Sequence, residues 1–297
     1  MDFLLWLDAT LVGTLGLLVG SFLNVVIYRL PKMLEAQWIA ECTSLNEESG
    51  VNQNGVNEAT PNRTMVAVAV PFNLMVPRSR CGQCGHAIRW YENIPLLSYL
   101  FLRGKCSSCG TGISLRYPLV ELTTGALFTF CATRWGWTAT TAAWCVFCAA
   151  MVTLACIDWD TTLLPDDITL PLLWLGLVAA ALRLNTQPSL QDALWGAVAG
   201  YLSLWAVYWA FKLVTGKEGM GYGDFKLFAA LGAWFGWQAL VPIILMASVI
   251  GALIGIAMKF SSGLREGGYI PFGPFLVGAG LTALVFGPQS ILRAVGL

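Results

Sequence analysis

Seven stretches that are uncharged or nearly so, each about long enough to cross a bilayer, dominate this sequence of 297 residues. A transmembrane helix needs roughly 20 consecutive apolar residues. The stretches lie at about 9–28, 117–133, 135–157, 163–182, 193–211, 227–258 and 269–292. The stretch at 227–258 is too long for one helix, and FGWQ at 235–238 favours a turn. We therefore predict an all-α polytopic membrane protein with about eight transmembrane helices.

The composition excludes a soluble globular protein, because 57% of the residues are hydrophobic and only 11% are charged. The first ten residues, MDFLLWLDAT, carry Asp2 and Asp8, and no basic residue precedes the first apolar stretch. A cleavable signal peptide has the opposite pattern, so we expect this helix to remain in the protein.

Basic residues are unevenly distributed, although the net charge is zero. Nine of the 17 Lys and Arg residues lie between the first two predicted spans, which places that segment in the cytoplasm by the positive-inside rule. With eight spans, the cytoplasmic side receives every basic residue except Arg134, Arg183 and Arg293. The distribution therefore supports eight spans in the cytoplasmic membrane.

The chain divides into the first transmembrane helix at 1–28, a cytoplasmic segment at 29–116 and a transmembrane domain at 117–297. Within the cytoplasmic segment, residues 41–64 are polar and lack periodicity, which predicts a flexible insertion. Residues 65–77 contain enough branched side chains to predict a short strand, broken by proline.

Two Cys-x-x-Cys pairs stand in the cytoplasmic segment, in CGQCG at 81–85 and CSSCG at 106–110. This spacing is typical of a structural zinc site, in which two tight turns present four thiolates. A redox dithiol is an alternative, whereas disulfides are disfavoured in a reducing cytoplasm. We predict a small zinc-ribbon-like domain at 81–109, in which Zn²⁺ is bound by Cys81, Cys84, Cys106 and Cys109. A closed site of four sulfurs has no open position, so its role is structural.

His86 is the only histidine. A His-Glu-x-x-His metalloprotease needs two histidines, and a membrane serine protease needs its base inside the bilayer. We interpret His86 as a polar residue beside the first cysteine pair.

Carboxylates are what remain for hydrolytic chemistry. IDWDTTLLPDD at 157–167 holds four aspartates between two apolar stretches, and KEGMGYGD at 217–224 places Asp224 ahead of another. Two predicted helices separate the motifs, so Asp158 and Asp224 reach the same cytoplasmic boundary. Two close carboxylates do not both ionise cheaply. One can activate water while the other protonates a departing amine, which is aspartic-protease chemistry.

Other interpretations of these residues stay open. Glycines at 219, 221 and 223 would allow close approach and dihedrals that other residues avoid. Asp167 and Asp224 immediately precede helical runs, where aspartate is a favoured N-cap. Boundary aspartates also carry ions in transporters.

Several long motifs together resemble the bacterial type IV prepilin peptidase family, also called leader peptidase/N-methyltransferase. They are GSFLNVVIYRLP at 20–31, CGQCGHAIRWYENIPLLSYLFLRGKCSSC at 81–109, ISLRYPLVELTTG at 113–125, IDWDTTLLPDDITLPLLWLGL at 157–177 and GKEGMGYGDFKLFAALGAW at 216–234. The resemblance implies a bifunctional Gly-x-Gly-Asp aspartic peptidase of the bacterial inner membrane. Its catalytic aspartates fall on Asp158 and Asp224. Asp158 is preferred to Asp160 because it occupies the leading place in the motif. Residues two apart on a helix point in different directions, so we do not expect both to face Asp224.

The resemblance also implies substrates and a second activity. The substrates are prepilins and the pseudopilins of type II secretion, which are cleaved at the cytoplasmic face and then N-methylated with S-adenosylmethionine. The methyltransferase candidates are Glu92, Gly104 and Lys105, although no glycine-rich cofactor fingerprint is present. We expect membrane and pilin partners and no nucleic acid. A carboxylate-dependent transporter and a non-catalytic zinc-ribbon assembly protein are the competing functions.

Overall fold

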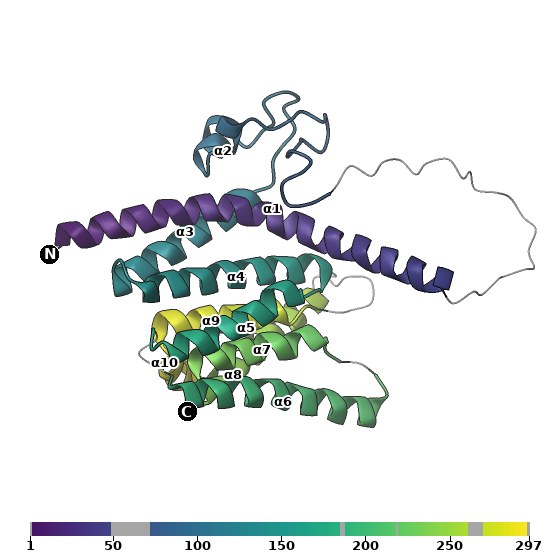
Figure 1. Ribbon diagram of the computed structural model, residues 1–297, viewed down its shortest axis with the longest axis vertical. Helices are drawn as coiled ribbons and strands as arrows, with labels where there is room; N and C mark the ends of the chain where they lie inside the picture. The colour runs from purple at the N-terminus through teal and green to yellow at the C-terminus, as the bar shows by residue number, and fades with distance from the viewer. Residues whose placement is uncertain (1, 49–71, 185–187, 218, 261–269, 296–297) are drawn as a thin grey trace, which may run out of the picture.

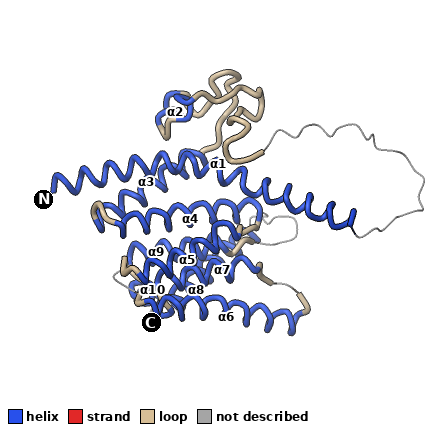
Figure 2. Tube along the Cα trace, in the orientation of Figure 1, coloured by secondary structure: helices blue, strands red, loops and turns tan. Residues whose placement is uncertain are grey.

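The computed structural model describes residues 2–48, 72–184, 188–217, 219–260 and 270–295, and the regular structure in these ranges is helical (Figures 1 and 2). Its α-helices are α1 (Asp2–Glu48), α2 (Leu97–Phe101), α3 (Arg116–Trp135), α4 (Ala139–Thr161), α5 (Asp166–Ala181), α6 (Leu190–Thr215), α7 (Tyr222–Phe235), α8 (Leu240–Phe260), α9 (Gly273–Phe286) and α10 (Pro288–Val295), with 3₁₀ turns η1 (Trp90–Asn93) and η2 (Trp237–Ala239). Within these ranges, the only extended pairing is two isolated β-bridges. The all-α prediction is therefore confirmed for the part described.

Helices α4 and α7 form the interior of the bundle. α4 packs against α1, α3, α5 and α9, while α7 is surrounded by α5, α6, α8 and α9. In Figure 1, the segment with α2 and the cysteines lies on one side of α1, and α4 to α10 lie on the other. The cysteine segment is thus separate from the helices that carry the aspartates.

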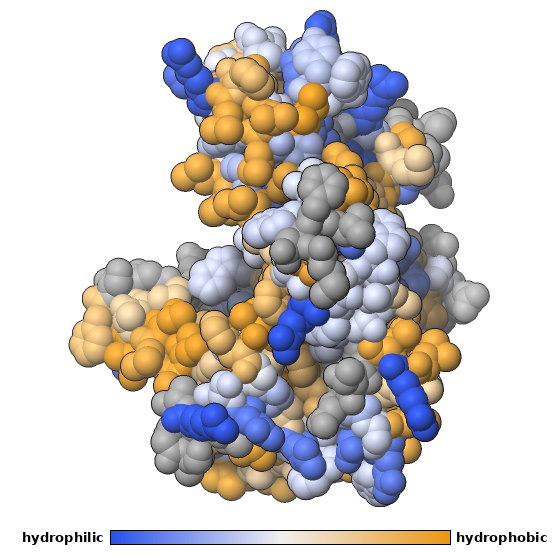
Figure 3. Space-filling model, turned by 90° about the vertical axis from the view of Figure 1, so that its left-hand side faces the viewer, coloured by the Kyte–Doolittle hydropathy of each residue, from blue (hydrophilic) through white to orange (hydrophobic). Residues whose placement is uncertain are grey.

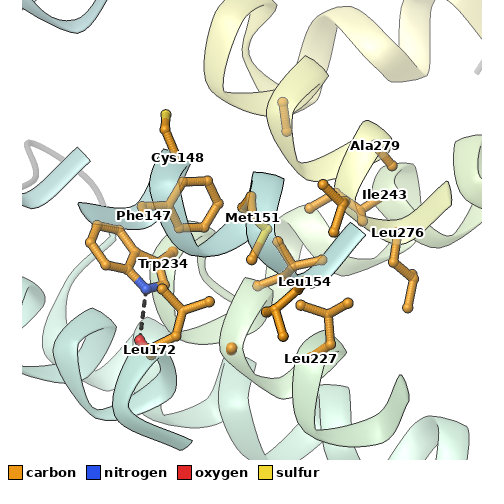
Figure 4. Close-up of a cluster of buried hydrophobic side chains, with 14 of the residues drawn as sticks. Phe147, Cys148, Met151, Leu154, Leu172, Leu227, Trp234, Ile243, Leu276 and Ala279 are labelled. Atoms are coloured by element: carbon orange, nitrogen blue, oxygen red, sulfur yellow. Dashed lines mark hydrogen bonds between the residues drawn. The ribbon is translucent and has the colours of Figure 1, made fainter. Parts of the chain in front are cut away.

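The packed core surrounds α7. Figure 4 shows Phe147 and Met151 of α4 beside Trp234 of α7, all fully or almost fully buried. The indole Nε1 of Trp234 donates a hydrogen bond of 2.9 Å to the backbone oxygen of Leu172 in α5. Because nearly every residue of α7 from Asp224 to Trp234 is buried, this helix is apolar on all sides, as expected of a helix inside a bundle.

Every predicted span coincides with a helix, but only four helices among the described residues are long and apolar enough to cross a membrane by themselves. These spans lie in α1 (Leu5–Leu45), in α4, in α6 and at Trp237–Phe260. α5, α7 and α9 have only 14 to 16 residues, and α3 includes Glu121 and charged residues near both ends. The chain is therefore a helical membrane protein with four candidate spans.

The first helix is longer than predicted. The apolar stretch ends near residue 28, yet α1 continues to Glu48. The end of an apolar stretch marks where an apolar environment ends, but it does not mark where the helix ends. Residues 33–42, MLEAQWIAEC, are rich in good helix formers and contain no glycine or proline, so the helix continues. The predicted flexible insertion at 41–64 is thus wrong for residues 41–48, and its remainder lies outside the described residues.

Two further local predictions can be compared with the structure. The predicted strand at 65–77 is wrong for residues 72–77, which form bends, while 65–71 lie outside the described ranges. The turn at 235–238 is confirmed, because Gly236 ends α7 with φ +82°. The last predicted span, 269–292, is interrupted at Gly287, whose φ of +83° separates α9 from α10.

Candidate aspartate pair and cysteine cluster

Asp158 and Asp224 lie at the same end of the bundle. Asp158 is in the last turn of α4 and Asp224 is in the first turn of α7. Figure 1 shows the end of α4 and the starts of α5, α7 and α9 together at this end. Only 4% of Asp158 and 7% of Asp224 is exposed. Buried aspartates are rare unless they are paired, coordinated or functional.

The two carboxylates act on each other electrostatically. Oδ1 of Asp224 is buried and receives no hydrogen bond from the described residues. Its side chain does not cap α7, because the N-cap is Gly221 and no side-chain cap is formed. The N-cap interpretation of Asp224 is therefore wrong, and so is that of Asp167, because the N-cap of α5 is Pro165.

The start of α9 encloses Asp158. A Cβ atom at Gly273 would lie 2.5 Å from Oδ2 of Asp158 and 3.3 Å from Cδ1 of Leu164. Leu164 also contacts Gly223, where a Cβ would lie 2.6 Å from the Cβ of Leu164. Gly273 and Leu164 thus connect the surroundings of the two aspartates.

The glycines before Asp224 differ in how much space surrounds them. None of Gly219, Gly221 and Gly223 has a positive φ, so the expected need for unusual dihedrals is wrong. Gly223 is required by its contact with Leu164, whereas a Cβ at Gly221 would meet only Oδ2 of Asp224, at 3.8 Å. Close approach is therefore the physical reason for glycine at 223, and position 221 is open beside the carboxylate.

Two of the three remaining aspartates of the motif, Asp160 and Asp166, form ion pairs. The guanidinium of Arg116 donates to Asp160 and to the backbone oxygen of Cys156. Nζ of Lys226 lies 2.6 Å from both carboxylate oxygens of Asp166. Because the Asp160 side chain is 38% exposed, it points away from the interior that Asp158 occupies.

The four predicted zinc ligands converge. The sulfur atoms of Cys81, Cys84, Cys106 and Cys109 all lie within 4.8 Å of one another. The Sγ atoms of Cys81 and Cys109 are 3.8 Å apart, and those of Cys84 and Cys106 are 4.0 Å apart. A tetrahedron with Zn–S bonds of about 2.3 Å has edges of about 3.8 Å, so this spacing fits zinc.

Each cysteine pair is shaped by the same local structure. Gly85 donates to the backbone oxygen of Cys81, and Gly110 donates to that of Cys106, both at 3.0 Å. Their φ angles of +70° and +72° belong to the left-handed region that favours glycine. The repeated Cys-x-x-Cys-Gly pattern therefore explains two equivalent turns that face each other.

Glu92 is held close to the cysteine cluster. Oε2 accepts the backbone N–H of Arg89 at 2.8 Å and lies 3.3 Å from Nε2 of His86. These contacts, with a hydrogen bond from Ser107, lower the pKa of Glu92 to about 2, the N–H of Arg89 contributing most. Glu92 is therefore a fixed, ionised carboxylate, and His86 is the polar neighbour of the cysteines that the sequence suggested.

Gly104 and Lys105 have different surroundings. Gly104 has a φ of +67°, and a Cβ there would lie 2.8 Å from the hydroxyl of Tyr99. Lys105 forms a β-bridge with Gly112. Both residues belong to the turn that leads into the second cysteine pair.

Two contacts attach the cysteine segment to the bundle, and sequence reasoning missed both. Arg29 of α1, which is 6% exposed, donates to the backbone oxygens of Asn73 at 2.8 Å and Pro77 at 2.6 Å. Glu121 of α3 accepts the N–H of Leu96 at 2.9 Å. The signal that could have identified both residues is a charged side chain inside or next to an apolar stretch. Gly273 could have been found from the Gly-Pro pair that opens α9.

The fold and these two groups of residues define a class, namely helical membrane proteins with a buried aspartate pair at one end of the bundle and a four-cysteine cluster in a separate segment on the other side of α1. The chain belongs to the type IV leader peptidase family. Residues 145–256 match the model of that family, and residues 14–135 match the model of the bacterial peptidase A24 N-terminal domain. The family resemblance seen in the sequence is confirmed.

The curated relatives cover nearly the whole chain. The prepilin leader peptidase/N-methyltransferase of Pseudomonas aeruginosa is 52% identical over 275 residues, which are 93% of this chain and 89% of that protein. The protein of the same name from Stutzerimonas stutzeri is 51% identical over equal shares. The one from Aeromonas hydrophila is 51% identical over 292 residues, 97% of this chain and 93% of its own. No solved structure matches the chain.

Proposed function

We propose that this chain removes the leader peptide from type IV prepilins and type II secretion pseudopilins and N-methylates the new N-terminal residue. The name that the relatives share joins these two activities. The observation that carries the peptidase assignment is the pairing of Asp158 and Asp224, which come from different helices and are buried beside each other. Two such carboxyl groups supply the acid and the base that peptide hydrolysis requires.

The peptidase mechanism follows from the shared environment of the pair. One carboxylate removes a proton from water as the water oxygen attacks the scissile carbonyl carbon. The other carboxyl group donates its proton to the departing amine, so the carbon–nitrogen bond breaks. Burial strengthens the electrostatic interactions of both groups. Gly273 and Leu164 keep the carboxylate of Asp158 in place, and the open side at Gly221 is where the peptide backbone approaches Asp224.

The membrane arrangement supports this assignment. We propose eight crossings of the bacterial inner membrane, with the aspartates and the cysteine segment on the cytoplasmic side. Basic residues favour that orientation, fourteen against three. Helices α5, α7 and α9 are shorter than the roughly 20 residues of a full span, but all three pack against other helices of the bundle. Cysteine labelling of engineered sites in the loops after α3 and α5, in intact cells, tests the crossings.

The cysteine cluster is proposed to bind structural zinc. Its sulfur spacing fits a tetrahedral site, and the metal would close the two turns on each other. When bound, S-adenosylmethionine supplies the methyl group that the amine nitrogen gains as the carbon–sulfur bond breaks and a proton leaves the nitrogen. Of the three methyltransferase candidates, Glu92 is the one whose surroundings suit a ligand.

Cleavage of a prepilin by the purified protein in liposomes tests the proposal, with leader loss and N-terminal methylation read by mass spectrometry. Asp158→Asn and Asp224→Asn should each abolish cleavage, while Asp160→Asn should retain it. A non-catalytic assembly protein predicts that all three variants behave like the wild type. A transporter predicts carboxylate-dependent ion flux without cleavage.

A further inference from the structure

The cysteine segment forms a separate upper part of the molecule (Figures 1 and 3). Charged residues attach it to the bundle at three places along the chain. Arg29 of α1 holds the loop at 73–77, near the start of the segment, and Arg116 at its end pairs with the end of α4. Glu121 of α3 binds Leu96, near its middle. The inference drawn from this middle contact rests on the proposed methyltransferase function.

Glu121 is a buried carboxylate inside an apolar helix. It lies between Val120 and Leu122 in α3, and only 8% of it is exposed. A carboxylate buried in apolar surroundings is costly unless it is hydrogen-bonded. Its Oε2 accepts the N–H of Leu96 at 2.9 Å, and Ser21 of α1 donates a second hydrogen bond to the carboxylate. Detachment of the cysteine segment would remove the first of these bonds, so the burial of Glu121 favours the attached state.

The two helices beneath this contact approach each other closely. A Cβ atom at Gly20 of α1 would lie 2.7 Å from Cα of Glu121, and Nδ2 of Asn24 in α1 donates to the backbone oxygen of Tyr117 at 3.1 Å. Glycine permits such a close approach of two backbones. Glu121 therefore has a defined position between α1 and α3, and the segment attaches at that position.

Leu96 has a backbone conformation that leucine rarely adopts. Its φ of +57° and ψ of −45° lie outside the main regions that are sterically allowed to residues with a Cβ. Such a conformation persists where surrounding contacts impose it, and it is concentrated at functional sites. Leu96 follows the buried Pro95 and precedes α2. The contact with Glu121 therefore fixes a loop that stands, in sequence, between the methyltransferase candidates Glu92 and Gly104.

α3 contacts both working parts of the protein. Through Glu121 it holds the cysteine segment, and through Arg116 it holds the helix end that presents Asp158. We propose that Glu121 is a positioning residue, which docks the cysteine segment on the bundle so that a substrate cleaved at the aspartate pair is methylated before it leaves the protein. A product that stays bound meets the second site at a high effective concentration, whereas a released product must find that site by diffusion.

Prepilin processing by the full-length, zinc-loaded protein in liposomes tests this role. Mass spectrometry over a single turnover would follow leader loss and N-terminal methylation in the wild type, Glu121→Leu, Glu121→Gln and Glu35→Leu. Glu35 is the matched control, because it is an exposed glutamate of α1. We expect Glu121→Leu to cleave within about twofold of the wild type but to accumulate at least about tenfold more unmethylated product, because the effective concentration is lost. Glu121→Gln keeps an acceptor for the N–H of Leu96 and should restore most of the methylation, and Glu35→Leu should behave like the wild type.

Hydrogen exchange, zinc content and a second substrate separate docking from folding. Residues 94–97 should exchange faster in Glu121→Leu than in the wild type, while the zinc content stays at the wild-type value. A short peptide with the mature N-terminus and no membrane helix reaches the segment from solution. It should therefore be methylated equally by Glu121→Leu and by the wild type.

Wild-type amounts of unmethylated product in Glu121→Leu would overturn the proposal. So would an equal loss of methylation on prepilin and on the short peptide, because Glu121 would then shape the methyltransferase site itself. A wild-type protein that cleaves prepilin but methylates neither substrate would instead refute the methyltransferase function on which the proposal rests.

Discussion

Arg116, the first residue of α3, forms an ion pair with Asp160 in the last turn of α4, two residues beyond Asp158. The same guanidinium bonds the backbone oxygen of Cys156 at 3.2 Å. Arg116 therefore ties the exit of the cysteine segment to the helix end that presents Asp158. Asp160 faces outward, because it is part-exposed and bound to Arg116, whereas Asp158 is buried.

Asp160→Asn should therefore lower kcat/KM for prepilin cleavage by less than about fivefold, because partly exposed ion pairs contribute about 1 kcal/mol or less. Asp158→Asn should lower it by about a hundredfold to ten-thousandfold, the usual effect of losing a general acid or base. Steady-state cleavage of a prepilin measures both. An inactive Asp160 variant beside an active Asp158 variant would reverse the assignment.

Gly273→Ala should inactivate the peptidase without unfolding it. Its Cβ would lie 2.5 Å from Oδ2 of Asp158, so the carboxylate must move from its present position. We expect at least a tenfold loss of cleavage, since small displacements of catalytic groups are costly. Gly278→Ala in the same helix is the control, because a Cβ there meets nothing within 4 Å. Equal activity of the two variants would contradict the role of Gly273.

Gly223→Ala should destabilise the protein by about 1–3 kcal/mol, the usual cost of overpacking. The added Cβ would lie 2.6 Å from that of Leu164. Gly221→Ala has open space and should change stability by less than about 1 kcal/mol, mainly through the N-cap. Thermal unfolding in detergent measures the difference. If Gly221→Ala proved the more destabilising change, the close contact with Leu164 would not be the reason for glycine at 223.

Arg29→Met should loosen the loop that precedes the cysteines. Without the guanidinium, the carbonyl groups of Asn73 and Pro77 lose their donor, at a cost of about 1–3 kcal/mol. Hydrogen exchange should accelerate in residues 73–80, and Arg29→Lys should restore part of the protection because Lys keeps a charged donor. Unchanged exchange in Arg29→Met would show that the loop is held by other contacts.

Zinc removal should abolish methylation more completely than cleavage. The cysteine segment lies on the other side of α1 from most of the bundle (Figure 1), and none of the residues found around the aspartates belongs to it. Cys84→Ser should lower the zinc content below one ion per chain and reduce methylation at least tenfold. Cys42→Ser, an exposed cysteine of α1, should change neither. Full methylation by zinc-free protein would show that the cluster does not order the methyltransferase site.

Local sequence patterns were sufficient for several parts of this protein. Apolar stretches located the helices from α3 to α9, and Gly236 ended α7 where FGWQ predicted a turn. Cys-x-x-Cys-Gly predicted two turns whose sulfurs converge. These features depend on residues close together in the chain, through hydropathy, backbone dihedrals or ligand spacing. The long motifs indicated the family, and the relatives confirm it.

Contacts between distant helices decided the rest. Whether Asp158 or Asp160 faces the interior depends on how α4 is rotated against α3 and α9, which no local pattern records. The need for glycine at 273 arises only because α9 approaches the end of α4, and Arg29 and Glu121 acquire partners only when the cysteine segment folds against α1 and α3. Hydropathy showed which residues leave water. Burial and pairing at one site depend on packing between segments far apart in sequence, and therefore only the tertiary structure could assign them.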